Sequence, residues 1–154
     1  MGTTAQKRLV RRLDLERWLQ QVETQPSPKA FLEQYATPAN VAAEMLFTAA
    51  YVHDDVIGKA IVDLGCGTGR LAIGTVLLGA RSAVGIDIDK TAVKMARVNA
   101  ANLTATEETD WVVGDIDILH GNFYAVLENP PFGIQKRTAD RRFLLKALEL
   151  APRV

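Results

Sequence analysis

The sequence has few of the residues from which disulfide frameworks and metal sites are built. Its 154 residues include one cysteine, Cys66, which excludes a disulfide framework and a cysteine-rich zinc site within the chain. The two histidines, His53 and His120, lie far apart in the sequence and make a poor set of metal ligands. We therefore expect no metal ion at the functional site.

Long apolar runs are also missing. No stretch approaches the ~20 apolar residues that a membrane-spanning helix needs. Residues 1–18, MGTTAQKRLVRRLDLERW, contain no apolar core of a signal peptide. Met1-Gly2 suggests N-myristoylation, but Gln6 stands where that motif has Ser or Thr. We expect a cytoplasmic protein without a membrane contact.

The net charge is zero, but the charges are unevenly distributed. Residues 1–20 carry five basic and two acidic side chains, and residues 133–154 carry six basic and two acidic side chains. The balance is therefore +3 and +4 at the two ends and −7 over residues 21–132, which hold seven basic and fourteen acidic side chains. Such asymmetry can mark a polyanion-binding surface, but the charge pattern taken alone favours solvated helix faces.

The amino-terminal third is predicted to hold two helices. Helical spacing predicts the first over residues 7–23, with an apolar stripe of Leu15, Trp18, Leu19 and Val22. TQPSPKA (24–30) predicts a linker. The second helix follows LEQYATP, with Thr37 as its N-cap and Pro38 at its first position. Its apolar stripe would consist of Val41, Ala42, Met45, Leu46 and Ala49.

Strands and helices alternate from residue 60 onward. The expected strands are 60–65, 82–88, 110–116 and 123–129. The expected helices are 68–80, 90–103 and 139–151, the second with Val93, Met95, Ala96 and Val98 facing inward. This alternation predicts an α/β fold with a mostly parallel sheet of about four strands and helices on both faces. We divide the chain into an N-terminal helix and linker, 1–30, and a ligand-binding domain, 31–154.

A glycine-rich loop, DLGCGTG (63–69), joins the first strand of this sheet to its helix. Glycine allows the tight turn and lets the backbone approach a ligand closely. Asp87 lies 22 residues after Gly65, at the end of the next strand. A carboxylate at that position accepts hydrogen bonds from both hydroxyls of a ribose. The spacing therefore predicts a nucleoside-binding site.

The loop favours S-adenosylmethionine over NAD as the cofactor. A dinucleotide-binding loop reads G-x-G-x-x-G, whereas this one reads G-x-G-x-G and begins with Asp63. An acidic group there would repel a pyrophosphate but would suit the sulfonium and ammonium groups of S-adenosylmethionine. Asp115, at the end of the third strand, is well placed for the adenine amino group.

Two prolines follow the fourth strand in LENPPFGIQ (127–135). A proline pair can simply end a strand, because proline has no N–H group. In a parallel sheet, however, this strand lies beside the first, so Asn129 would face the cofactor's methyl group. The amide oxygen of Asn129 and the carbonyl of Pro130 can accept the protons of a planar amine, and Phe132 can stack on a flipped base. The motif predicts methyl transfer to an exocyclic amine.

The motifs DLGCGTG, GIDID and ENPPFG together resemble those of Rossmann-like class I S-adenosylmethionine-dependent methyltransferases that act on amino groups. LEQYATP followed by AAEMLF and DLGCGTGRLAIGTVLLGA resembles, more narrowly, the archaeal and eukaryotic methyltransferase-like protein five family over residues 7–151. This resemblance implies methylation of adenine N6 in small-subunit ribosomal RNA. The chain is thus expected to be an RNA methyltransferase.

The resemblance also implies the residues of the site. Those that close over the cofactor are Gln34 and Thr37. Those that line it, from methionine through ribose to adenine, are Gly65, Gly67, Thr68, Arg70, Asp87, Asp115 and Ile116. Those that hold the target amine are Asn129, Pro130, Pro131 and Phe132.

Two further expectations come from the resemblance. A small zinc-binding activator protein would pair along the edge of the third strand and cover it. Family members continue beyond the helix at 139–151 with about three more strands, in the order 3-2-1-4-5-7-6. We therefore expect the sequence to be truncated at its C-terminus, and its fourth strand to be a bare apolar edge.

Other functions share the Asn-Pro-Pro-Phe motif. DNA adenine methylases carry it, and so do methyltransferases that act on protein glutamine, whose amide is also planar. A cofactor-binding module without catalytic activity is a further alternative. The basic residues that follow the motif favour a nucleic acid, since phosphate contacts supply most sequence-independent affinity. They are Lys136, Arg137, Arg141 and Arg142.

Overall fold

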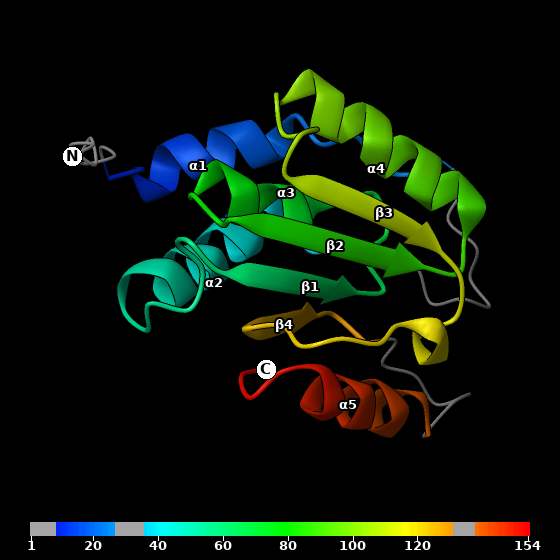
Figure 1. The fold of residues 1–154 in the computed structure, drawn as a ribbon. Coiled ribbons are helices and arrows are strands. Elements are labelled where there is room, and N and C mark those ends of the chain that lie inside the picture. The colour runs from blue at the N-terminus through cyan, green and yellow to red at the C-terminus, as the bar shows by residue number, and fades with distance from the viewer. Residues whose placement is uncertain (1–8, 27–35, 131–137) are drawn as a thin grey trace.

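The computed structural model describes residues 9–26, 36–130 and 138–154 (Figure 1). Within these ranges no helix is both long and apolar enough to span a membrane. The elements in chain order are α1 (Arg12–Gln20), α2 (Ala39–Tyr51), β1 (Ala60–Leu64), α3 (Arg70–Leu77), β2 (Ser82–Asp87), α4 (Lys90–Asn102), β3 (Thr109–Val113), η2 (Ile116–Ile118), β4 (Ala125–Glu128) and α5 (Ala139–Leu150). The expected site and basic residues outside the described ranges are Gln34, Pro131, Phe132, Lys136 and Arg137.

The four strands form one parallel sheet in the order β3-β2-β1-β4. β1 is central, and its last residue, Leu64, lies opposite Ile86 of β2 and Glu128 of β4. The carboxyl ends of these three strands therefore meet at one edge of the sheet, where open α/β sheets bind their ligands. The predicted parallel α/β fold, with the fourth strand beside the first, is confirmed.

Helices cover both faces of the sheet (Figure 1). Ile61 belongs to the buried apolar cluster that α1, α2 and α3 form on one face. The neighbouring residue Val62 points to the other face and packs in a second cluster with Leu150 of α5 and Ile116 of η2. Side chains of successive strand residues alternate between faces, so strands that are apolar throughout supply both clusters.

The amino-terminal helix α1 shares a hydrophobic core with the sheet. Leu15 and Leu19 are fully buried, and they pack in the same cluster as α2 and α3. The three helices meet at Gly74 of α3, where an added Cβ would lie 2.4 Å from Leu46 Cδ1 and 3.3 Å from Leu19 Cδ2. The division of the chain at residue 30 stays a prediction, and it does not correspond to separate cores.

The buried face of α2 differs from the expected stripe. Val41 and Met45 are 48% and 37% exposed, whereas Ala43 and Ala50 are buried. Small side chains let α2 approach its neighbours closely, so alanines take the inward positions. The helix also begins one residue later than predicted, because Pro38 occupies the N-cap position and Ala39 is the first helical residue.

The inward face of α4 was also predicted wrongly at one position. Val98 is 58% exposed, and Asn99 beside it is buried. The Asn99 side chain donates from Nδ2 to the carbonyl oxygens of Glu23 and Thr68, and its Oδ1 accepts from Glu23 N. A buried amide with three hydrogen bonds is well satisfied, so α4 turns this polar residue inward in place of valine.

The outer edge of β4 is covered at one position, where we expected a bare edge. Val126 N donates to Arg153 O at 2.8 Å, and Ala125 forms a parallel bridge with Arg153. The Arg153 guanidinium also forms an ion pair with Asp55, with 2.8 Å between Nε and Oδ1. The segment after α5 thus lies alongside β4 and satisfies part of its edge.

Candidate active site

The glycine loop forms a tight turn between β1 and α3. Gly65, Gly67 and Gly69 have φ angles of 69°, 54° and 93°, in the left-handed region that favours glycine. The backbone N–H of Gly67 donates to Asp87 Oδ2 at 2.9 Å, which holds the loop against the end of β2. A Cβ added at Gly67 would meet no atom within 4 Å. The middle of the loop therefore faces open space at the carboxyl edge of the sheet.

Asp87 lies where the spacing predicted a ribose-binding carboxylate. Its Oδ1 accepts from Asp89 N at 2.8 Å, and its Oδ2 accepts from Gly67. Burial raises the pKa of Asp87, and these backbone N–H groups partly oppose the rise. Each carboxylate oxygen has a second lone pair, so the group can still accept from two hydroxyls. The residues present fit the adenosyl part of the cofactor, and the role of Asp87 stays a prediction.

Asp63 has a different environment from the one that we expected. It is 2% exposed, and its Oδ2 accepts from Ala72 N at 3.1 Å. The N-cap residue of α3, Gly69, has no side chain to cap the helix, so Asp63 does this from β1. Burial raises the pKa of Asp63 to about 7. Its carboxyl group thus bonds to the first turn of α3 and is almost entirely shielded from solvent.

A tryptophan under the loop was missed by the sequence reasoning. Trp111 of β3 lies opposite Gly85 of β2, and its ring covers that glycine. An added Cβ at Gly85 would lie 2.5 Å from Trp111 Cζ3, and one at Gly69 would lie 2.7 Å from Trp111 Cη2. The indole ring thus packs against both the glycine loop and β2. A glycine inside the strand SAVGID was the available signal, because such a glycine often marks a close approach.

The Arg70 side chain, which we expected along the methionine part of the cofactor, donates to three backbone carbonyls. Nε donates to Leu19 O at 3.2 Å, Nη1 to Thr37 O at 2.6 Å, and Nη2 to Val22 O at 3.1 Å. Burial lowers the pKa of Arg70. Arg70 therefore joins the start of α3 to the end of α1 and to the segment before α2. Its predicted place beside the methionine part of the cofactor stays a prediction.

The carboxyl end of β4 brings Asn129 next to Thr37. Asn129 Nδ2 donates to Thr37 Oγ1 at 3.1 Å. The expected N-cap bond from the Thr37 side chain to α2 is absent among the described residues, which corrects that prediction. Asn129 is exposed and Pro130 is half-buried. Their roles in holding a target amine stay predictions.

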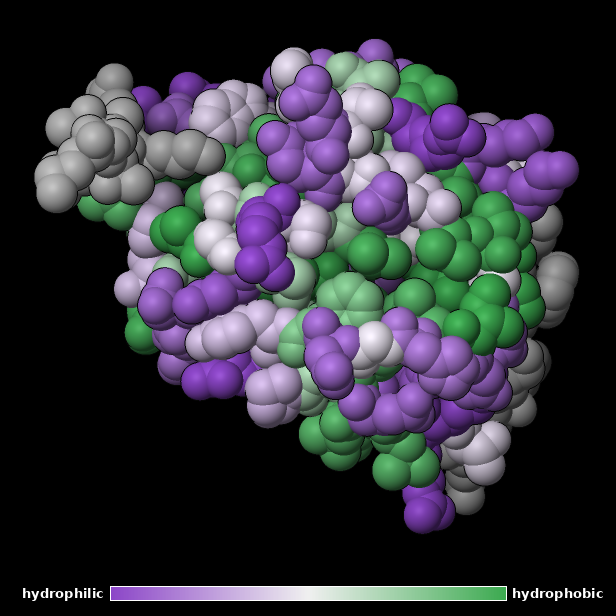
Figure 2. Space-filling view, in the orientation of Figure 1, coloured by the Kyte–Doolittle hydropathy of each residue, from purple (hydrophilic) through white to green (hydrophobic). Residues whose placement is uncertain are grey.

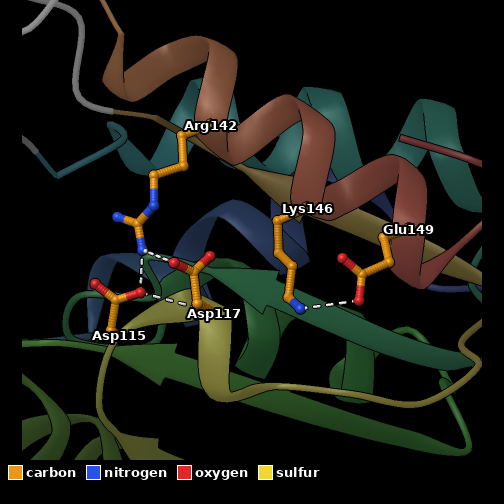
Figure 3. A network of polar contacts seen from close by, with 5 residues as sticks. All are labelled: Asp115, Asp117, Arg142, Lys146 and Glu149. Carbon is orange, nitrogen blue, oxygen red and sulfur yellow. Dashed lines mark hydrogen bonds and ion pairs between the residues drawn. The ribbon is translucent and has the colours of Figure 1, made fainter.

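Asp115 forms an ion pair at the position where we expected the adenine amine. Its carboxylate accepts from Asp117 N and from the guanidinium of Arg142, which also contacts Asp117 Oδ2 at 2.9 Å (Figure 3). The Asp117 N–H group is the main cause that lowers the pKa of Asp115, and Arg142 adds to it. Ile116 is buried in the second apolar cluster. An adenine amine at Asp115 would share the carboxylate with Arg142.

The fold and this edge of the sheet define the class. A parallel 3-2-1-4 sheet, a G-x-G-x-G loop and a carboxylate on the second strand are typical of Rossmann-like methyltransferases that use S-adenosylmethionine. The sequence matches the ribosomal protein L11 methyltransferase (PrmA) family over residues 45–127. That segment contains the glycine loop, Asp87 and Asp115.

A relative with a named activity matches nearly the whole chain. Mettl5 of Drosophila melanogaster, named as an rRNA N(6)-adenosine-methyltransferase, is 42% identical over 90% of this chain and 68% of its own length. The chain belongs to the family of these methyltransferases, as the motifs predicted.

Solved structures agree with this assignment. A candidate RNA methyltransferase of Pyrococcus horikoshii has a TM-score of 0.83 and 38% identity, and the match covers 91% of this chain and 69% of that one. An RNA methyltransferase of Salinibacter ruber in complex with S-adenosyl-L-homocysteine has a TM-score of 0.58 and 27% identity, over 77% and 72% of the two chains. Both structures share the fold of this chain.

Proposed function

We propose that the chain transfers a methyl group from S-adenosylmethionine to the N6 amine of adenine in RNA, with small-subunit rRNA as the preferred substrate. The name of the Drosophila relative supports the reaction, and the two RNA methyltransferase structures support the substrate class. The S-adenosyl-L-homocysteine in the Salinibacter structure supports the cofactor.

The position of Asn129 is the observation that carries this proposal. Glu128 of β4 lies opposite Leu64 of β1, so Asn129 follows at the level of the glycine loop. The amide is thus at the edge of the sheet where the Gly67 backbone is held against Asp87. A target base that enters from solvent would meet both groups there.

The chain's own groups suit an amine acceptor. The cofactor supplies an electrophilic methyl group, and the exocyclic nitrogen of adenine is a poor nucleophile because its lone pair is delocalised into the ring. The amide oxygen of Asn129 and the backbone carbonyl of Pro130 would accept the two amine protons and orient the nitrogen toward the methyl group. No strong base is needed first, since positive charge develops on the nitrogen as the bond forms.

The test is a methyl-transfer assay with three substrates: small-subunit rRNA, an adenine-containing DNA duplex and a glutamine-containing peptide. We expect N6-methyladenosine in the RNA digest. Asn129→Ala should lower the single-turnover rate at least ~100-fold, the effect of losing one positioned polar group, and leave cofactor affinity nearly unchanged. Asn122→Ala is the matched control, because Asn122 is exposed in the loop before β4. It should behave as wild type.

The other outcomes identify the alternatives. Methylated DNA or peptide without methylated RNA would assign the site to those substrates. Cofactor binding in calorimetry without transfer to any of the three would indicate a binding module. Full activity of Asn129→Ala would show that this amide does not hold the target amine.

We also propose that a small zinc-binding activator protein pairs along β3. Among the described strands, β3 pairs with β2 alone, so its other edge is open. Two exposed apolar side chains belong to β3 and to the turn that follows it. Val113, the last residue of β3, is 48% exposed, and Ile118 of η2 is 58% exposed. Figure 2 shows apolar surface toward the carboxyl ends of the strands. Coexpression with the activator should raise solubility and melting temperature, and an unchanged melting temperature would contradict this pairing.

A further inference from the structure

The side chain of Asn129 is held by a residue far away in the sequence. The hydrogen bond from its Nδ2 to Thr37 Oγ1 joins residues that are 92 positions apart. Thr37 immediately precedes Pro38, the N-cap residue of α2, whereas Asn129 follows β4. A hydroxyl oxygen has two lone pairs, so it can accept from an amide nitrogen while it donates elsewhere. In this structure the nitrogen of the amide, and not its oxygen, faces Thr37.

Thr37 is itself fixed to the start of α3. Its carbonyl oxygen accepts from Arg70 Nη1 at 2.6 Å, a short charge-assisted bond. The two other nitrogens of Arg70 donate to Leu19 O and Val22 O. These three hydrogen bonds together fix the position of the guanidinium beside Thr37. Arg70 follows directly after Gly69 of the glycine loop. The Thr37 hydroxyl is thus positioned relative to the cofactor loop.

The orientation of the Asn129 amide decides what it can offer to a substrate. A side-chain amide presents a donor at Nδ2 and an acceptor at Oδ1, and rotation by a half-turn exchanges them. The amine of adenine has protons to donate, so it needs the acceptor. With Nδ2 bonded to Thr37, Oδ1 is on the opposite side of the amide.

We propose that Thr37 is a positioning residue for methyl transfer, which turns the Asn129 amide so that its oxygen faces the target amine, and that Arg70 holds Thr37 in place. This role rests on the proposed function of Asn129. It differs from the direct cofactor contact that the resemblance implied for Thr37. A cofactor contact would be visible in cofactor affinity, whereas a positioning role is visible in the transfer rate at saturating cofactor.

The test compares Thr37→Val, which removes the hydroxyl at nearly constant shape, with Thr37→Ser, which keeps it. We expect single-turnover transfer to RNA to fall about 10- to 100-fold in Thr37→Val, the range for a misplaced reacting group. Thr37→Ser should stay within about 3-fold of wild type, and the cofactor Kd should be the same in all three. Thr106→Val is the matched control, because Thr106 is exposed in the loop before β3.

A double variant tests whether Thr37 acts through Asn129. If it does, Thr37→Val should cause no further loss of rate in an Asn129→Ala background, because coupled residues are not additive. An equal loss in both backgrounds would overturn the proposal. So would a cofactor Kd at least 10-fold weaker in Thr37→Val with an unchanged transfer rate, since that would make Thr37 a cofactor ligand.

A readout without activity separates this proposal from the proposed function. The side-chain NH2 resonances of Asn129, assigned in ¹⁵N-labelled protein by comparison with Asn129→Ala, should shift in Thr37→Val and not in Thr106→Val. If the wild type methylates no adenine, the proposed function fails, and the resonances still report whether Thr37 holds the amide. Asn129 resonances that are identical in wild type and Thr37→Val would overturn the positioning role.

Discussion

Replacing Asp63 by asparagine tests whether a buried carboxyl group holds the helix after the glycine loop. The side chain is 2% exposed, and it accepts from Ala72 N at 3.1 Å. Burial is the main cause that raises its pKa to about 7, the Ala72 N–H group opposes the rise, and the nearby Asp87 adds to it. Asparagine keeps an oxygen for the Ala72 N–H group and has no charge at any pH.

The sign of the effect follows from the pKa of Asp63 in the two states. In an unfolded chain the pKa of aspartate is about 4, and in the folded protein that of Asp63 is about 7. Between these values the folded state binds the additional proton, so its stability falls as the pH rises from about 4 to about 7. The loss is at most about 1.4 kcal/mol per pH unit. Asp63→Asn lacks this loss, so the variant should gain stability relative to wild type over that window.

The assay is urea denaturation of wild type and Asp63→Asn at pH 5, 6, 7 and 8. The difference in the free energy of unfolding should move in favour of the variant between pH 5 and 7 and should level off above pH 8. Asp110→Asn removes one negative charge from an exposed position on β3 and is the matched control. A difference between Asp63→Asn and wild type that is the same at every pH would refute the reasoning.

Two other predictions concern the loop and its supports. Asp87→Ala should weaken S-adenosylmethionine binding by about 1.5–3 kcal/mol, the range for hydrogen bonds to a charged group; unchanged affinity in calorimetry would remove Asp87 from the site. Gly85→Ala would place a Cβ 2.5 Å from the Trp111 ring. We expect it to destabilise the fold by about 1–3 kcal/mol, as overpacked cores do, in urea denaturation, and a stability equal to wild type would show that the ring moves freely.

The sheet could be predicted because its strands and helices are encoded by patterns of neighbouring residues. The strands are mostly apolar, and each βα unit repeats the same order of elements, so the order and direction of the strands follow from general rules. The contact between Gly67 and Asp87 could be predicted for the same reason, because the two residues belong to one βαβ unit and are only 20 positions apart. The helix faces were harder. α2 has apolar residues on most sides, and close packing with α1 and α3 turned Ala43 inward in place of Met45.

The contacts that join distant segments could not be predicted from local patterns. The hydrogen bond between Thr37 and Asn129 depends on where the ends of two separate elements meet in the folded chain. Arg70 shows the same limit, since an arginine at the start of a helix after a glycine loop suggests a ligand contact. Its three carbonyl partners come from the ends of α1 and the segment before α2, which only the packing of these helices against α3 brings near.

These long-range contacts also impose an order on assembly during synthesis. The ribosome releases the amino-terminal segment first, yet Arg70 is made 51 residues after Leu19, and Asn129 is made 92 residues after Thr37. The apolar side of α1 can pack against α2 as soon as α2 is made, and its contacts with α3 follow later. A nascent chain halted between residues 70 and 129 would have Arg70 available to fasten its amino-terminal helix, but the amide at the end of β4 would not yet exist. The amino-terminal segments are thus made first, but they receive some of their partners only when α3 and the end of β4 have been made.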